Sequence, residues 1–263
     1  ADSAGLERGE QFTSPHAFRD WHAQRLIDQG VALENVQAVL GHSTPATTRA
    51  VYAPDPDRRA IDAADKAFAG WSQTTPFHRG ALLRKAAEHV LEQLEEIAVL
   101  MTSEQGKPLA EARGEVKKGA EILRYYAEEG ERVFGRIIPN AEGNTIESRV
   151  IYQPIGVAGL LSPWNYPVEL MAWKVAASLA AGCTFVLKVP SETPLSPLAF
   201  ARAVQSAGFP AGVINVVTGR GSEIGSVLTG SEKIKKIAFT GSTAVGRTIM
   251  AESAASLRHL SLE

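Results

Sequence analysis

The sequence contains only one cysteine, Cys183, among its 263 residues. One thiol permits neither an internal disulfide nor a cysteine-based metal cluster, and it fits a reducing compartment. No apolar run approaches the roughly 18 residues that a membrane helix requires. The first residues, ADSAGLERGEQF, also lack the apolar core of a signal peptide. We therefore expect a cytoplasmic protein without membrane contact and without a metal site.

A strong charge of either sign is also absent. Lysine and arginine total 27, aspartate and glutamate total 29, and the net charge is −2. No basic tract is long enough to bind nucleic acid by electrostatics alone, so the composition does not favour DNA as a partner. The apolar content of 44% is sufficient for a full core in one large or two small domains.

The central part of the chain has the pattern of a strand, a helix and a second strand. Residues 157–161 and 184–187 are short apolar runs, and residues 168–180 carry the aliphatic side chains of a buried helix. Strands without alternating polarity are typical of a parallel sheet that is covered on both faces, and ligands bind beyond the carboxyl ends of such strands. The residues near these ends are Ser162, Trp164, Asn165 and Lys188.

The alternation of strands and helices continues on both sides of this unit. We predict further strands at residues 213–217, 236–239 and 258–262 and further helices at residues 196–207, 221–228 and 243–254. Amphipathic patterns predict an upstream helical layer at residues 59–69, 76–104 and 109–134. The alternating segment TIESRVIY predicts a strand from Thr145 to Tyr152. The expected fold class is α/β, with an open, mostly parallel sheet that is incomplete at Glu263.

The first part of the chain has a different character. Three short helical patterns, two of them ended by glycine, occupy residues 13–53. Two prolines and alternating charges in PDPDRRAIDAA then mark a junction near Pro54. The sequence therefore predicts a short all-α segment over residues 1–53 and an α/β domain over residues 54–263.

The segments SPHAFRDWHAQRLIDQG and VQAVLGHSTPATTRAVYA resemble the carboxyl-terminal part of the tyrosine recombinase, or phage integrase, family. The resemblance implies that His16, Arg19 and His42 correspond to phosphate-binding side chains. It also implies that Tyr52 corresponds to the nucleophile that attacks phosphorus. The earlier arginine and lysine of that family have no counterpart in the sequence. The alternative, which we favour for activity, is a helical remnant whose histidines and tyrosine only pack.

The turn FTGSTAVG, residues 239–246, follows a predicted strand and begins a predicted helix. Backbone N–H groups at a helix N-terminus can bind a diphosphate, but two glycines in such a turn can also have a purely steric role. Taken with SPWNYP, WKVAASLAAGC, VLKVPSETP, GVINVVTG and LSLE, in this order, the turn resembles the coenzyme-binding part of the aldehyde dehydrogenase superfamily. EQGKPLAEARGEV and AFAGWSQTTPFHRGALLRKAA extend this resemblance to residues 55–263. It implies a Rossmann-like sheet and favours the semialdehyde-type branch.

The resemblance implies roles for individual residues. Asn165 corresponds to the amide that holds the oxyanion formed when a thiolate attacks the aldehyde. Glu263 corresponds to the general base for water attack, and Lys174 to a lysine near the proton path; ordinary surface charges are the alternative for both. The residues at positions that bind the nicotinamide cofactor are Trp164, Lys188, Ser191, Gly241, Ser242 and Gly246.

Two departures from the family pattern affect the expected activity. The glutamate that accepts from both ribose hydroxyls is Ser191 here, and its loss removes repulsion against a 2′-phosphate, so we expect NADP or NAD as cofactor. The catalytic cysteine has no counterpart, because Cys183 matches a non-catalytic position on an apolar strand. We expect a domain that is truncated before the catalytic cysteine and cannot oxidise a small aldehyde alone.

Two other classes of function remain open from the sequence. Residues 1–53 leave the possibility of a recombinase remnant with a DNA-binding role. The strand from Thr145 to Tyr152 resembles the oligomerisation strand of the aldehyde dehydrogenase superfamily, so the chain can also be an interaction module that forms a homo-oligomer. Completeness of motifs favours the oxidoreductase.

Overall fold

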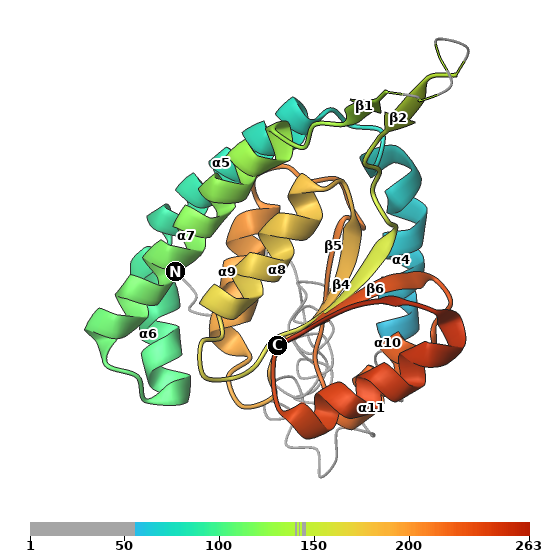
Figure 1. Ribbon diagram of the computed structural model, residues 1–263. Helices are drawn as coiled ribbons and strands as arrows, with labels where there is room; N and C mark the ends of the chain where they lie inside the picture. Colours follow the sequence, from blue (N-terminus) through green and yellow to red (C-terminus); the bar gives the residue numbers. More distant parts are fainter. Residues whose placement is uncertain (1–55, 140, 142, 144–145) are drawn as a thin grey trace, which may run out of the picture. The chain divides into compact units, whose positions relative to one another are not determined.

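The computed structural model describes residues 56–139, 141, 143 and 146–263 (Figure 1). The helices predicted within residues 13–53 lie outside this part, as do His16, Arg19, His42 and Tyr52. The helices are α4 (Pro56–Trp71), α5 (Pro76–Glu92), α6 (Leu94–Gln105), α7 (Leu109–Glu131), α8 (Glu169–Ala180), α9 (Leu195–Gln205), α10 (Gly221–Gly230), α11 (Thr243–Ser253) and the 3₁₀ turn η1 (Ala254–Ser256). The strands are β1 (Arg136–Ile138), β2 (Ser148–Val150), β3 (Val157–Leu161), β4 (Thr184–Lys188), β5 (Ile214–Val217), β6 (Ile234–Phe239) and β7 (His259–Leu262).

Five strands form one parallel sheet in the order β5-β4-β3-β6-β7. Every residue of β3 and β4 is buried, because helices cover both faces of the sheet. Helices α8 and α9 pack on one face, and α4 and α10 pack on the other. The predicted α/β fold with a parallel sheet is therefore confirmed. None of the helices in the described residues combines the length and apolar character needed to cross a membrane.

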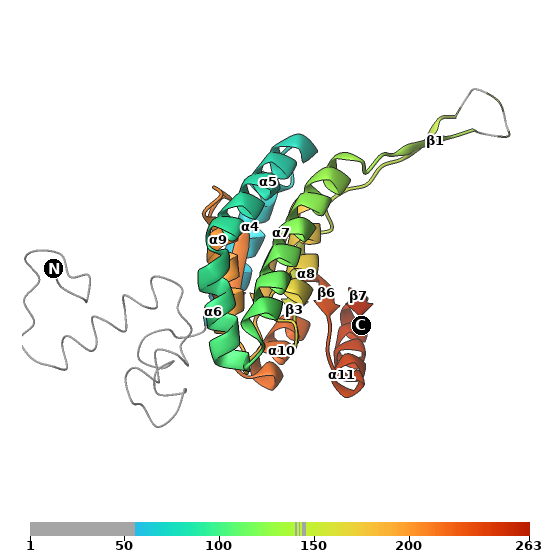
Figure 2. The same cartoon turned by 90° about the vertical axis from the view of Figure 1, so that its left-hand side faces the viewer.

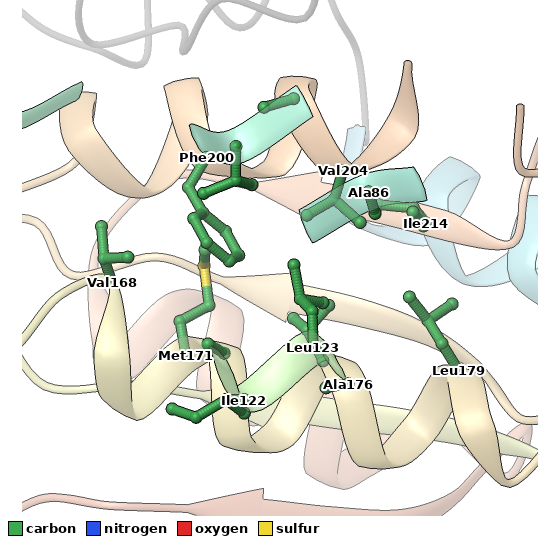
Figure 3. Packing of buried hydrophobic residues seen from close by; sticks show 14 of the residues in the cluster. Ala86, Ile122, Leu123, Val168, Met171, Ala176, Leu179, Phe200, Val204 and Ile214 are labelled. Atoms are coloured by element: carbon green, nitrogen blue, oxygen red, sulfur yellow. The ribbon is translucent and has the colours of Figure 1, made fainter. Parts of the chain in front are cut away.

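The largest part of the core lies around α8 and α9, between the sheet and the outer helical layer of α5, α6 and α7. Figure 3 shows side chains from α5, α7, α8 and α9 that converge there, including Leu123, Met171 and Phe200. The ring of Phe200 lies so close to α7 that a Cβ on Gly119 would come within 2.8 Å of it. A glycine at this position lets the two helices approach each other, and the helical layer is thereby fixed relative to the sheet.

The helix predicted over residues 76–104 is two helices, α5 and α6. They are separated at Gln93, whose φ of −99° and ψ of 13° are not helical. The prediction of one helix was wrong because neither glycine nor proline marks the break and both halves favour helix. Tertiary packing decides this break, since both helices contact α7 and α9.

The predicted strand from Thr145 to Tyr152 is shorter in the structure, where β2 covers Ser148–Val150. Thr145 lies outside the described residues. The partner of β2 is β1, an antiparallel strand that the sequence analysis did not predict. The two strands project from the rest of the unit as an arm (Figures 1 and 2). The arm exposes large apolar side chains, and Ile137 is 71% accessible.

A buried ion pair joins the helical layer to the start of α8. The carboxylate of Glu115, which is only 4% exposed, pairs with the ammonium of Lys107. The same carboxylate accepts hydrogen bonds from the backbone N–H groups of Val168, at 2.9 Å, and Glu169, at 3.1 Å. A buried charge is tolerated only when it is paired and hydrogen-bonded. Glu115 therefore fixes the start of α8 and the loop before it.

We predict that Glu115→Leu lowers the free energy of unfolding by about 3–5 kcal/mol, because Lys107 would keep a buried charge without its partner. Urea unfolding of the 263-residue chain, followed by circular dichroism, measures this change. The control is Glu121→Ala, which breaks an exposed pair with Lys118 and should change stability by about 1 kcal/mol or less. Similar effects of the two substitutions would contradict this account of the ion pair.

Candidate functional site

A cleft of about 1170 Å³ lies beyond the carboxyl ends of β3, β4 and β6. Its walls come from the loop after β3 (residues 162–168, the β3 loop), the turn after β4 (residues 189–194, the β4 turn), α10 and α11. The position agrees with the general rule that open α/β sheets bind ligands beyond the carboxyl ends of their strands. The predicted site residues that line the cleft are Trp164, Asn165, Lys188, Gly241, Ser242 and Glu263.

The β3 loop is held through its main chain. The side-chain nitrogen Nε2 of Gln105 donates to the carbonyl oxygens of Trp164 and Asn165 at 2.9 and 2.8 Å. The ammonium of Lys107 donates to the carbonyl oxygen of Asn165 at 3.1 Å and lies 4.0 Å from the centre of the Tyr166 ring. Trp164 and Asn165 line the cleft, and Trp164 is 54% exposed. The loop thus presents an indole and an amide on a fixed backbone.

The β4 turn carries the lysine of the site. Lys188 is the last residue of β4 and is only 8% exposed. Its ammonium donates to the hydroxyl of Ser191 at 3.2 Å, and this hydroxyl donates to the carbonyl of Gly219 at 3.1 Å. Ser191 is therefore a bridge between the turns after β4 and β5 rather than part of the cleft lining. It places a neutral hydroxyl beside the ammonium of Lys188.

The turn between β6 and α11 is fixed to the strands on both sides of β6. The backbone N–H of Thr240 donates to the carbonyl of Leu161, at the end of β3, at 3.2 Å. The N–H of Gly241 donates to the carbonyl of Glu263, after β7, at 3.1 Å. These hydrogen bonds align the carboxyl ends of three neighbouring strands at the cleft.

The first turn of α11 faces the cleft. Ser242 is its N-cap, and the hydroxyl accepts from the N–H of Val245 at 3.4 Å. A Cβ on Gly241 would lie 2.5 Å from the Phe239 ring, so the close approach of this ring requires a glycine. Gly246 is buried, and it does not line the cleft. The N-terminal N–H groups of α11 are thus of the kind that can bind an anion.

A chain of hydrogen bonds links Lys174 on α8 to Glu263. The Lys174 ammonium donates to the hydroxyl of Thr240 at 2.6 Å and to the carbonyl of Leu170 at 3.2 Å. The Thr240 hydroxyl donates to the Glu263 carboxylate at 3.2 Å. Burial lowers the pKa of Lys174, while the nearby charge of Glu263 opposes this shift. Thr240 and Glu263 line the cleft, and Lys174 lies behind them.

Cys183 lies away from this cleft. It directly precedes β4, whose opposite end carries Lys188, and it is 5% exposed. Burial raises the pKa of its thiol, although backbone hydrogen bonds from Ile155 and Gly156 and the charge of Arg79 act in the opposite direction. A buried thiol with a raised pKa is a poor nucleophile.

Four functional side chains of the site were missed by reasoning from the sequence. Gln105 and Lys107 lie in EQGKP, which entered the analysis only as part of a resemblance, and Glu115 lies in the same segment. Thr240 lies within FTGSTAVG, where only the glycines and Ser242 received a role. The sequence showed only that each of these residues lies in a segment with a family resemblance. It could not show their partners, because most of these contacts join residues far apart in the chain.

Comparison with known proteins identifies the family of this chain. Residues 36–263 match the model of the aldehyde dehydrogenase family. The chain belongs to this family. Residues 1–58 match the phage integrase family, so both resemblances predicted from the sequence are confirmed.

The relatives include semialdehyde dehydrogenases. Glutarate-semialdehyde dehydrogenase of Pseudomonas putida is 47% identical over 208 residues, which cover 78% of this chain and 43% of that protein. Succinate-semialdehyde dehydrogenase [NADP(+)] of Escherichia coli is 45% identical over 211 residues, which cover 80% of this chain and 43% of that protein. The chain thus spans less than half the length of these curated relatives.

Solved structures of the family have the same fold over this part. The crystal structure of an Escherichia coli NADP-dependent enzyme has a TM-score of 0.78 and 44% identity, covering 80% of this chain and 43% of that one. Betaine aldehyde dehydrogenase of Staphylococcus aureus in complex with NAD+ has a TM-score of 0.75 and 36% identity, covering 79% and 41%. The fold of residues 56–263 is therefore that of the family.

Proposed function

We propose that residues 56–263 form the coenzyme-binding part of a semialdehyde-type aldehyde dehydrogenase and bind NADP or NAD in the cleft. The observation that carries this proposal is the convergence of Asn165, Lys188 and the N-terminus of α11 at adjacent strand ends. An amide, an ammonium and helix N–H groups suit an oxyanion, ribose hydroxyls and a diphosphate, respectively.

Features of the cleft other than the family motifs also fit a dinucleotide. The hydroxyl of Ser162 is buried in the cleft wall and has no hydrogen-bond partner among the described residues. A buried hydroxyl normally has a partner, which a bound polar ligand can supply. A Cβ on Gly225, in the α10 wall, would meet no atom within 4 Å. The wall at this point therefore leaves open space in which a flat ring can lie.

The proposed chemical roles follow the geometry of the site. A bound nicotinamide cofactor supplies the acceptor for a hydride. Asn165 donates its side-chain amide to the oxygen of the aldehyde as negative charge develops there. Glu263 removes a proton from water, and Lys174 and Thr240 hold its carboxylate in place through the hydrogen bonds described above.

The nucleophile is the group that the described site does not supply. Cys183 is the only cysteine of the sequence, and it lies at the opposite end of β4 with a raised pKa. We propose that the covalent step requires the part of the family that the match to this chain does not span. Relatives named for glutarate and succinate semialdehydes favour a carboxylated aldehyde as the substrate.

Association and the N-terminal segment also belong to this proposal. The arm of β1 and β2, with exposed Ile137 and Ile138, is the proposed surface for a homo-oligomer, because exposed apolar patches of this kind mark protein contacts.

The match of residues 1–58 to the phage integrase family supports a recombinase remnant in that segment. The single cysteine supports a cytoplasmic location.

We predict that Lys188→Met weakens NADP+ binding by about 1–3 kcal/mol, because hydrogen bonds from the ammonium to the ribose are lost. Methionine keeps most of the side-chain volume, so the strand end remains packed. Isothermal calorimetry on the 263-residue chain measures the affinity. Lys235→Met, at an exposed position of β6, is the control and should bind as the wild type does. Absence of binding of either cofactor to the wild-type chain at millimolar concentration would refute the proposed function.

Ser191→Glu is predicted to change the preference between the two cofactors. A carboxylate at this position repels a 2′-phosphate and can accept from both ribose hydroxyls. We expect the ratio of NADP+ to NAD+ affinity to fall by about tenfold or more, a shift of about 1.4 kcal/mol for each factor of ten. Ser103→Glu adds the same charge on the exposed side of α6 and should leave the ratio unchanged. An unaltered ratio in Ser191→Glu would show that Ser191 does not face the ribose.

The 263-residue chain is predicted to oxidise no aldehyde above background, even with saturating cofactor. Without a thiolate no covalent adduct forms from which hydride can leave. Formation of reduced nicotinamide is followed by absorbance with short and carboxylated aldehydes, for the wild type and for Cys183→Ala. Turnover that disappears in Cys183→Ala would make Cys183 the nucleophile, and turnover that survives would mean that oxidation proceeds without a cysteine adduct.

A further inference from the structure

The last turn of α6 contacts the β3 loop and the start of α9, just after the β4 turn. Gln105 reaches the β3 loop, where its Nε2 donates to two successive carbonyl oxygens, those of Trp164 and Asn165. One amide group thereby orients two adjacent peptide groups. The side chains that these peptide groups carry are the indole and the amide that line the cleft.

Glu104, the preceding residue, reaches the start of α9. Its carboxylate accepts from the backbone N–H groups of Leu195, at 2.6 Å, and Ser196, at 2.9 Å, and from the hydroxyl of Ser196. These groups begin α9, which directly follows the β4 turn. A carboxylate at a helix N-terminus satisfies N–H groups that have no partner within the helix and is attracted by the helix dipole.

The two loops are also joined directly. The hydroxyl of Thr193, a residue that is 2% exposed, donates to the carbonyl of Trp164 at 3.2 Å. The carbonyl of Trp164 thus receives hydrogen bonds from Gln105 on α6 and from the β4 turn. Gly106 ends α6 with a φ of +82°, and its N–H donates to the carbonyl of Thr102 at 2.8 Å. The helix end that carries both contacts is therefore well defined.

We propose that Glu104 and Gln105 are positioning residues that set the separation and orientation of the β3 loop and the β4 turn. Through them, one helix end determines how the oxyanion amide of Asn165 lies relative to the cofactor site at Lys188. The expected effect on cofactor affinity rests on the proposed function. The structural part of the inference, the orientation of the β3 loop, does not depend on a cofactor.

The partners of each position determine which hydrogen-bonding group it needs. Position 105 must donate, because its partners are two carbonyl oxygens, and a carboxylate there would place negative charge against both. Position 104 must accept, because its partners are two N–H groups and a hydroxyl. Exchange of the two residues keeps composition, net charge and helix propensity, but it removes the donor at position 105 and the negative charge and one acceptor oxygen at position 104.

The test is the double variant Glu104→Gln/Gln105→Glu in the 263-residue chain. The indole N–H signal of Trp164 in ¹⁵N-labelled protein reports the β3 loop without cofactor, and Trp164→Phe assigns it. We expect this signal to shift or broaden while that of Trp71, buried in the core, stays in place. We also expect the dissociation constant for NADP+, measured by calorimetry, to rise by about tenfold, since the hydrogen bonds that orient the β3 loop are lost.

A matched control exists at the end of α5, where the same pair of residues occurs as Glu92 and Gln93. Glu92→Gln/Gln93→Glu should leave both the Trp164 signal and the affinity unchanged. Gln105→Leu serves as a second variant if the exchanged chain does not fold, and the same changes are expected of it.

The outcomes separate this inference from the proposed function. An unchanged Trp164 signal together with an unchanged affinity in the exchanged variant overturns the inference. A shifted Trp164 signal with wild-type affinity for NADP+ overturns the link between the helix end and the cofactor site. If the wild-type chain binds no cofactor but the signal still shifts, the proposed function fails and the positioning role is supported.

Discussion

Glu115 lies where the helical layer, the segment after α6 and the start of α8 meet, and the site depends on this contact. Its carboxylate combines an ion pair to Lys107 with hydrogen bonds from the backbone N–H groups of Val168 and Glu169, where the β3 loop meets α8. Each interaction alone would not offset the desolvation of a buried charge, but together they satisfy both carboxylate oxygens. Because the β3 loop ends where α8 begins, movement of this charge would displace Asn165 and Lys174 together.

The helical layer of α5, α6 and α7 therefore does more than cover α8 and α9. Its core residues fix α7 and α8 relative to each other, as Figure 3 shows for Leu123 and Met171. Its polar residues Gln105 and Glu115 then reach the β3 loop and the start of α8. The loops of the cleft carry exposed side chains on backbones that are tethered from outside. Such tethering gives the preorganisation that electrostatic stabilisation of a developing charge requires.

The parts of this structure that the sequence predicts are those determined locally. The apolar runs of β3 and β4 and the glycines around Phe239 are patterns only a few residues long. They predict strands and turns without reference to distant segments, so the sheet and the ends of its strands were predicted correctly. The break at Gln93 depends on packing against α7 and α9 and was missed. Strand β1 was missed because its three residues are too few to show an alternating pattern. Gln105 and Thr240 could not be assigned partners, because their contacts join residues far apart in the sequence.

The order of strands in the sheet bears on synthesis by the ribosome. β3 lies at the centre, and its two neighbours are β4, which follows after one helix, and β6, which is made only after α9, β5 and α10. Until Ile234–Phe239 has emerged from the exit tunnel, one hydrogen-bonding edge of β3 has no parallel partner, and its apolar residues are covered incompletely. Nascent chains with such open edges are prone to misassembly. A pause in translation before β6 would therefore prolong the state in which a chaperone is most needed.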